Sequence, residues 1–468
     1  MVQRYDFFFE KEAQYEQYKF FFLPLHAQNQ QINPVFIRKI HCMKRLVSLF
    51  AILLPYFCCS QNSVFYEANL ELNSVKLPLT IEYQKRSDDT LKLHFGSPFQ
   101  TDDLFLADKA YLKGDSILFQ VKVAGIVYRG RFSENGDTIS GTFKQGLLNT
   151  PLVFAKKGEK FSYIRWQTPK PPFNYIIEDI EFTNPKLPNY VFKGTLTKPK
   201  KGKNFTCVIL ISGSGIQNRD SEIFGHKPFA VLANHLTSCG IAVFRFDDRG
   251  YKSSDPSFAD ATTFDYVTDV EAAISMIRQR SDIDSTSIGL IGHSEGGLIA
   301  QIVASKDSLL QFIVLMAAPG LTGRDILTSQ LRAITASEGI TDTAIINQRL
   351  EQQRQAIDGE NTPKWLTTFC IIDPKNYLPL ITQPTLVLQG MKDLQVVPEE
   401  NIVAITENFG KKVGNNSLTI RKFPDNNHLF QRCKTGLPNE YGEIDLTIDM
   451  DVLYHLQLFI RDRAKTKR

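Results

Sequence analysis

Cysteines, dense basic blocks and long apolar runs are all scarce in this sequence, and each scarcity excludes a class of protein. The 468 residues contain 7 cysteines, whose scattered spacing suits neither a disulfide-dense scaffold nor a zinc site. A single disulfide among them stays open, whereas Cys207 lies in an apolar run and is predicted to be a buried thiol. The formal net charge is only +4, so composition gives nucleic-acid binding no support. We predict no metal, no cofactor and no nucleic-acid partner.

Residues 43–60 have the layout of a secretory signal peptide. Two basic residues after Met43 precede an apolar stretch of about a dozen residues and a small-residue end. Such a stretch is too short for a permanent membrane span, so we predict export to the periplasm or the extracellular space after cleavage near Ser60. Translation is predicted to start at Met43, which makes residues 1–42 a doubtful extension. A membrane anchor or a short buried helix is the alternative, and a lipoprotein is disfavoured because bulky residues precede Cys58.

A length of 468 residues favours two domains over one, and the apolar pattern differs between two parts of the chain. Residues 62–160 alternate apolar and polar positions over short segments, for example 77–83 and 117–123. The turn at 134–137 is a strong hairpin signal. We predict a small antiparallel β domain, either a barrel or a sandwich, followed by a Pro-rich linker at 161–172. Its role stays open between an accessory module for binding or association and a passive addition.

The second part, residues 173–468, opens with a predicted antiparallel hairpin and then changes character. Uninterrupted apolar strands alternate there with helical segments, and the clearest of these strands are 206–211, 241–246, 311–316 and 385–389. Strands that are apolar on both sides belong to a parallel sheet with helices on both faces. We therefore predict an α/β fold, in which chemistry collects at the carboxyl ends of the strands.

One such strand ends in the sequence Gly-His-Ser-Glu-Gly at residues 292–296, and helix-forming residues follow. Strand, tight turn and helix are the context in which a Gly-x-Ser-x-Gly pattern carries a nucleophile, although the pattern alone also occurs by chance. The turn is predicted to strain the backbone of Ser294 and to expose its hydroxyl. The N–H of Glu295 then lies at a helix N-terminus, which favours a developing negative charge.

Five motifs in order along this part resemble those of the α/β-hydrolase superfamily, and more narrowly a branch of secreted bacterial esterases with an extra N-terminal domain. They are Gly213-Ser214-Gly215-Ile216-Gln217-Asn218-Arg219-Asp220, Phe246-Asp247-Asp248-Arg249-Gly250, Gly292-His293-Ser294-Glu295-Gly296-Gly297, Gly390-Met391-Lys392-Asp393 and Asn427-His428. The resemblance implies the α/β-hydrolase fold and a small-molecule ester substrate. One departure is visible, because Tyr251 and Lys252 stand where the family usually keeps a further small residue.

A serine needs a base and an orienting acid, and the chain order Ser, acid, His is that of this fold. His428 is the predicted base, although an isolated loop histidine is more often only a surface residue. Asp393 follows the strand 385–389 and is the predicted acid. Asp425 is the competing acid, ranked lower because it comes just before His428 instead of directly after a strand.

The loop after the strand 206–211 is expected to supply the second oxyanion donor. Gly213 allows the backbone to approach the substrate closely, and the N–H of Ser214 is the predicted partner of the Glu295 N–H. The nearby charged residues have two interpretations: they form ion pairs that brace this loop, which we favour, or Arg219 binds part of the substrate. These residues are Arg219, Asp220, Asp247 and Arg249.

Residues 321–382 form an insertion between two strands, and apolar residues recur in it at helical spacing. This indicates an amphipathic helical lid, although ordinary core contacts give the same spacing. The resulting hypothesis is a serine hydrolase that cleaves carboxylic esters through an acyl-enzyme. Two alternatives stay open, namely a peptidase or amidase with the same residues and a non-catalytic secreted binding protein that uses the β domain.

Overall fold

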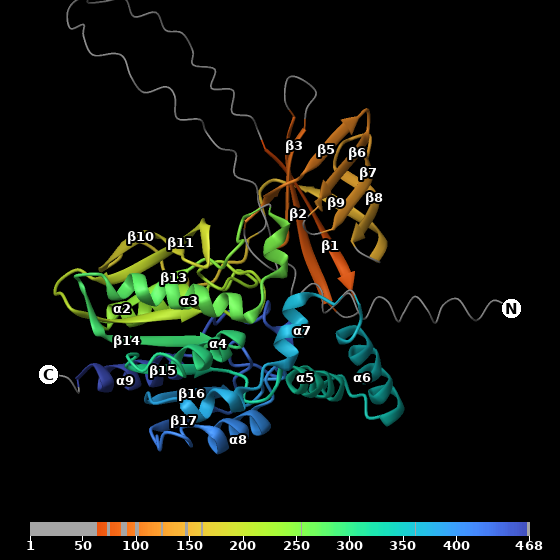
Figure 1. Ribbon diagram of the computed structural model, residues 1–468. Helices are drawn as coiled ribbons and strands as arrows, with labels where there is room; N and C mark the ends of the chain where they lie inside the picture. Colours follow the sequence, from red (N-terminus) through yellow and green to blue (C-terminus); the bar gives the residue numbers. More distant parts are fainter. Residues whose placement is uncertain are drawn as a thin grey trace, which may run out of the picture.

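The computed structural model describes residues 63–465, except 73–74, 86–90, 99–102, 123–124, 146–147, 161, 254 and 361. The predicted signal peptide and the extension before it lie outside the described residues, so export stays a prediction. Among the described helices, none has the length and apolarity needed to cross a bilayer. The described strands form two sheets that are joined by residues 158–174 (Figure 1).

The first sheet, here called the N-terminal sheet, has nine described strands, each paired antiparallel with its neighbours in the order β4-β3-β2-β1-β9-β8-β7-β6-β5. Alternating inward side chains form its core, in which Phe119, Tyr128 and Phe154 are fully buried. The predicted hairpin at 134–137 is confirmed, since it joins β7 to β8. The strands are β1 (Val64–Leu72), β2 (Val75–Lys85), β3 (Leu91–Gly96), β4 (Phe105–Leu106), β5 (Lys109–Lys113), β6 (Ser116–Val121), β7 (Ile126–Phe132), β8 (Thr138–Gln145) and β9 (Leu148–Lys157).

The second sheet has eight described strands in the order β10-β11-β13-β12-β14-β15-β16-β17. Its first two strands form the predicted antiparallel hairpin, β11 pairs antiparallel with β13, and the strands from β13 to β17 run parallel. The α/β core of the prediction is thus present, and Cys207 is fully buried in it as expected. The strands are β10 (Tyr175–Asn184), β11 (Leu187–Pro199), β12 (Phe205–Ile211), β13 (Ala242–Phe246), β14 (Ile283–His293), β15 (Phe312–Met316), β16 (Thr385–Gly390) and β17 (Leu418–Phe423).

Helices cover both faces of the second sheet, and each face has its own apolar cluster. The helices α3 (Thr263–Arg278), α4 (Glu295–Ala304) and α8 (Pro398–Asn408) bury side chains in one cluster. The helices α2 (Pro228–Ser238) and α9 (Met450–Lys465) bury side chains in the other. Burial on both faces explains why the central parallel strands β15 and β16 are mostly apolar and fully buried, whereas the edge strand β17 carries exposed Arg421 and Lys422.

Three further helices lie in the predicted insertion: α5 (Gly323–Ser337), α6 (Thr343–Ile357) and α7 (Lys364–Ile371). On α5, Ile326, Leu327 and Leu331 are buried, with Ile326 at 4% exposure, whereas Ile334 is only partly buried. On α6 the expected stripe is not buried, since Ile345 is 42% exposed and Ile357 is the buried residue of that helix. Helical spacing on α6 therefore does not mark a core face. Polar side chains of α6 contact α5 instead, since Arg349 donates to Thr335 at 3.2 Å and Gln353 donates to the Leu327 carbonyl oxygen at 3.2 Å.

Candidate active site

Ser294 lies in the sharp turn between β14 and α4, and its backbone is strained as predicted. Its φ is 56° and its ψ is −124°, outside the regions that suit a residue with a side chain. The flanking glycines are required, because a Cβ at Gly292 would lie 2.1 Å from the Gly296 carbonyl oxygen. A Cβ at Gly296 would lie 2.2 Å from the Ile211 carbonyl oxygen. The close contact between β14, the turn and α4 therefore requires glycine at both positions.

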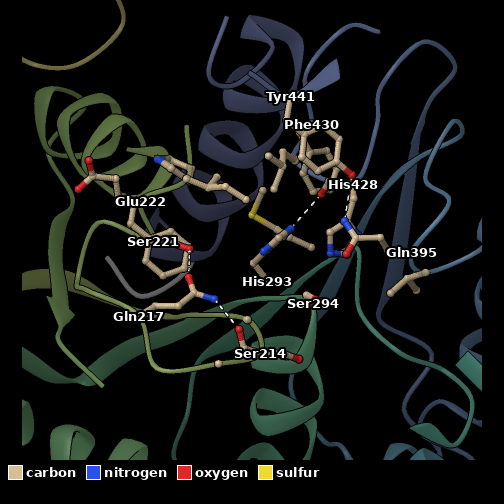
Figure 2. Close-up of a pocket in the computed structure, with 18 of the residues that line it drawn as sticks. Ser214, Gln217, Ser221, Glu222, His293, Ser294, Gln395, His428, Phe430 and Tyr441 are labelled. Atoms are coloured by element: carbon tan, nitrogen blue, oxygen red, sulfur yellow. Dashed lines mark hydrogen bonds between the residues drawn. The ribbon is translucent and has the colours of Figure 1, made fainter. Parts of the chain in front are cut away.

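Ser294 and His428 line one pocket of about 200 Å³ at the carboxyl ends of the parallel strands. Figure 2 shows both residues facing this pocket. Its apolar lining comes from β15 and the loops of the second sheet and from α2, α5 and α7: Ile216, Ile223, Phe229, Leu232, Met316, Ile326, Leu327, Trp365, Phe369, Val396, Leu429, Phe430, Tyr441 and Ile448. A mostly apolar cavity with few polar groups is typical of a small-molecule site.

His428 follows β17 and pairs with Asp393, which follows β16. The distance from His428 Nδ1 to Asp393 Oδ2 is 2.8 Å, and the side chains are 5% and 0% exposed. The other carboxylate oxygen of Asp393 accepts the N–H groups of Gln395 at 2.8 Å and Val396 at 2.9 Å. Asp393 is therefore fixed in orientation, as an acid that orients an imidazole must be.

Asp425, the competing acid, does not reach the pocket. Its side chain is 71% exposed and pairs with Lys392 Nζ at 3.3 Å. The carbonyl oxygen of Asp425 also accepts the N–H of Cys433 at 2.9 Å. Asp425 thus belongs to the outside of the loop that carries His428, and Asp393 is the carboxylate in contact with the imidazole.

His293, the residue before the serine, had no role in the sequence analysis and proves to support His428. Its Nε2 lies 2.9 Å from the His428 carbonyl oxygen, so a protonated Nε2 donates to it. Burial, together with the neighbouring His428, lowers the pKa of His293 to about 3. A neutral His293 therefore holds the backbone of the loop while adding no positive charge beside the second imidazole.

The loop 212–218 lies directly against the serine. A Cβ at Gly213 would approach the Ser294 Cβ to 3.3 Å, so glycine allows this close contact. Buried Asp248 holds the loop from below by accepting the Ser212 hydroxyl at 2.9 Å and the Gln217 N–H at 2.8 Å. The Gln217 amide in turn donates to the Ser214 carbonyl oxygen at 2.9 Å (Figure 2). The Ser214 backbone is therefore held next to Ser294.

The four charged residues Arg219, Asp220, Asp247 and Arg249 form ion pairs and are not among the residues that line the pocket. Arg219 Nη2 donates to Asp247 at 2.6 Å, and Asp247 also accepts the Arg219 N–H at 2.8 Å. Asp220 accepts the Arg245 guanidinium at 2.8 Å. Arg249 donates to Asp269 of α3 at 2.7 and 2.8 Å. The loop-bracing interpretation therefore fits Arg219 and Asp247, whereas Arg249 pairs with a helix.

The Glu295 side chain is a further feature that the sequence analysis missed. It is buried in the second sheet's core and accepts the Thr263 hydroxyl at 2.6 Å and the Trp365 indole N–H at 3.0 Å. The Ser214 side chain also forms a hydrogen bond with it. Burial raises the pKa of Glu295, although the bonds from Thr263, Ser214 and Trp365 oppose the shift. One carboxyl group thus joins the serine turn, the loop 212–218, α3 and α7.

His226, on the wall behind the pocket, gives a testable pH dependence of stability. It is 1% exposed, its Nδ1 lies 2.8 Å from the Thr447 hydroxyl, and burial lowers its pKa to about 4. An unfolded histidine has a pKa of about 6.5, so the unfolded chain binds this proton more readily than the folded protein. Stability should therefore fall as the pH drops below about 6.5, by about 2 kcal/mol at pH 5. Denaturant titration of the wild type and of His226→Gln at pH 7.5 and pH 5 measures the free energy of unfolding. The loss at pH 5 should be smaller in the variant, and equal losses in both proteins would contradict the prediction.

Within the described residues, no group of three or more His, Cys, Asp or Glu side chains is arranged to hold a metal ion.

Comparison with known proteins gives one family match, described as serine aminopeptidase, S33, over residues 226–366. That range includes Ser294 but ends before Asp393 and His428. A relative is the esterase EstD of Thermotoga maritima, 25% identical over 246 residues, which cover 50% of this chain and 57% of EstD. The chain therefore spans little more than half the length of that relative.

Solved structures with a similar chain course include two hydrolases. Est1E from Butyrivibrio proteoclasticus is 16% identical, with a TM-score of 0.42 over 61% of this chain and 98% of its own. A 2,6-dihydroxy-pseudo-oxynicotine hydrolase is 16% identical, with a TM-score of 0.42 over 62% of this chain and 69% of its own. Together, the family match at the serine turn and the relative EstD support the resemblance to esterases of the α/β-hydrolase superfamily, and the second sheet is consistent with that fold.

Proposed function

We propose that this protein is a serine hydrolase that cleaves carboxylic esters through an acyl-enzyme. The observation that carries the proposal is the buried 2.8 Å contact between His428 Nδ1 and Asp393, in the same pocket as the strained Ser294. A hydrogen bond at Nδ1 leaves Nε2 as the nitrogen that accepts a proton from the serine hydroxyl.

In this mechanism Ser294 Oγ attacks the ester carbonyl carbon while His428 Nε2 takes its proton. Asp393 stabilises the resulting imidazolium, and the imidazolium then protonates the departing alcohol. Water, activated by the same imidazole, attacks the acyl-enzyme and releases the acid. The developing oxyanion is assigned to the N–H groups of Ser214 and Glu295. The second of these is the first residue of α4, whose N–H has no partner within the helix.

An ester is favoured over an amide because the relative EstD carries the name esterase. The family description instead names an aminopeptidase, and one triad serves either bond. The small, mostly apolar pocket suits a compact acyl group.

The proposal is tested by a matched pair of substrates and by a covalent probe. Hydrolysis of p-nitrophenyl acetate is expected to exceed hydrolysis of p-nitroacetanilide in kcat/KM, and a fluorophosphonate is expected to label Ser294, located by peptide mass spectrometry. An amide preference would support the peptidase alternative. Absence of both turnover and labelling would support the non-catalytic alternative and contradict the proposal.

A further inference from the structure

Tyr251, one of the two residues that depart from the family pattern, lies in the pocket wall and is held there by the N-terminal sheet. Tyr251 is one of the residues that line the pocket containing Ser294. Its hydroxyl donates to Asp103 Oδ2 at 2.9 Å in a partly buried hydrogen bond. Asp103 lies just before β4, so the acceptor comes from the other sheet and is 148 residues distant in sequence.

The phenol is held from two further directions. The side chain of Asn218, which also lines the pocket, forms a hydrogen bond with Tyr251. Lys252 places its ammonium 2.6 Å from the same Asp103 oxygen and 5.4 Å from the centre of the Tyr251 ring. Lys252 adopts a φ of 58°, which is unfavourable for a residue with a side chain. Strained backbone persists only where the surrounding structure fixes it, and such residues cluster at functional sites.

The N-terminal sheet also packs against other residues of the pocket wall. Phe224 and Tyr441 belong to the same apolar cluster as the core of that sheet, and Leu429, next to His428, packs against it. Between the sheets, the Arg165 guanidinium donates to the carbonyl oxygens of Phe224 at 3.0 Å and Gly442 at 2.7 Å. Figure 1 shows the N-terminal sheet and α5–α7 at the same end of the second sheet. The pocket therefore lies where the two sheets meet.

We propose that Tyr251 is a specificity-determining residue, positioned by Asp103 of the N-terminal sheet, which limits the length of the substrate group lying along the loop 213–218. This inference rests on the proposed ester hydrolysis and gives the N-terminal sheet a part in it. A large ring fixed by two hydrogen bonds excludes the end of a long substrate group from space in the pocket. A mobile or smaller side chain would leave that space open. Discrimination of this kind changes the ratio of kcat/KM between substrates.

The test compares p-nitrophenyl acetate, butyrate and octanoate, and then methyl and octyl butyrate, so that the acyl and alcohol groups vary separately. In one of the two series, Tyr251→Ala is expected to raise the long-to-short ratio of kcat/KM about tenfold. Tyr251→Phe and Asp103→Ala keep the ring but free it, so each should give a smaller rise in the same series. Adding Asp103→Ala to Tyr251→Ala should change nothing further, because Asp103 acts through the ring.

Tyr111→Ala is the matched control, since this tyrosine is 59% exposed on the N-terminal sheet and is not among the residues that line the pocket. Its substrate profile should equal that of the wild type. Thermal unfolding of each variant separates a changed profile from lost structure, and Tyr251→Phe serves if Tyr251→Ala does not fold. Ratios unchanged in both series, with Ser294 still labelled, would overturn the inference and leave the proposed function intact. A wild type without turnover or labelling would overturn both.

Discussion

Replacing Ser294 with alanine is expected to abolish ester hydrolysis, with kcat falling roughly 10⁴- to 10⁶-fold. The hydroxyl forms the acyl bond, and neither the imidazole nor the oxyanion donors can substitute for it. What remains is the small rate enhancement that comes from binding and from the oxyanion donors alone. Turnover of p-nitrophenyl acetate measures the loss, and fluorophosphonate labelling should disappear with it.

Ser305→Ala is the matched control for this substitution. Ser305 lies at the other end of α4, where its hydroxyl donates to the Ile302 carbonyl oxygen at 2.7 Å. This variant should keep full activity. The φ of 56° at Ser294 suits alanine no better than serine, so the melting temperature of Ser294→Ala should stay close to that of the wild type. Full turnover by a folded Ser294→Ala protein would refute the proposed nucleophile.

The second large effect is expected for Asp393→Asn, with kcat reduced on the order of 10⁴-fold. Two backbone N–H groups hold one oxygen of Asp393, so an asparagine keeps its carbonyl oxygen there. Its amide NH₂ then faces His428 Nδ1 in place of the oxygen 2.8 Å away. An N–H donor at this position favours the tautomer that carries its proton on Nε2. Such an imidazole cannot accept the serine proton.

Asp425→Asn is the control, because this exposed carboxylate contacts Lys392 instead of the imidazole. It should retain kcat within about twofold, as surface ion pairs contribute little. Crystals or NMR spectra of Asp393→Asn should show the unchanged loop and the altered tautomer. If Asp425→Asn loses activity and Asp393→Asn does not, the assignment of the acid is reversed.

The parts of the site that are encoded locally were predictable from the sequence. Ser294 follows from a strand, two glycines and a helix within one short stretch, and its strained backbone is confirmed. Asp393 and His428 follow from the rule that parallel strands end at one edge, and the structure brings both to that edge. Their catalytic roles remain a proposal, which the variants above test.

Features that depend on distant segments could not be predicted. Sequence alone does not distinguish an arginine that binds substrate from one that braces a loop. The loop-bracing interpretation of Arg219 depends on its contact with Asp247, which only the structure gives. Tyr251 stood out as a departure from the family, but its acceptor lies on a separate sheet. The side chain of Glu295 occupies a variable position of the serine motif, so no pattern announced its contact with Trp365 of α7.

The Glu295 carboxyl group has a consequence for how the pocket opens. Trp365 reaches it from α7 and stacks on Phe369 of the same helix, so lifting α7 away removes one of the donors that keep a buried carboxyl group satisfied. A buried carboxyl group that loses a donor must take up water or a proton. An ionised Glu295 would therefore resist displacement of α7. Because Ser214 shares the same carboxyl group, we expect a displacement of α7 to shift the loop 212–218 as well.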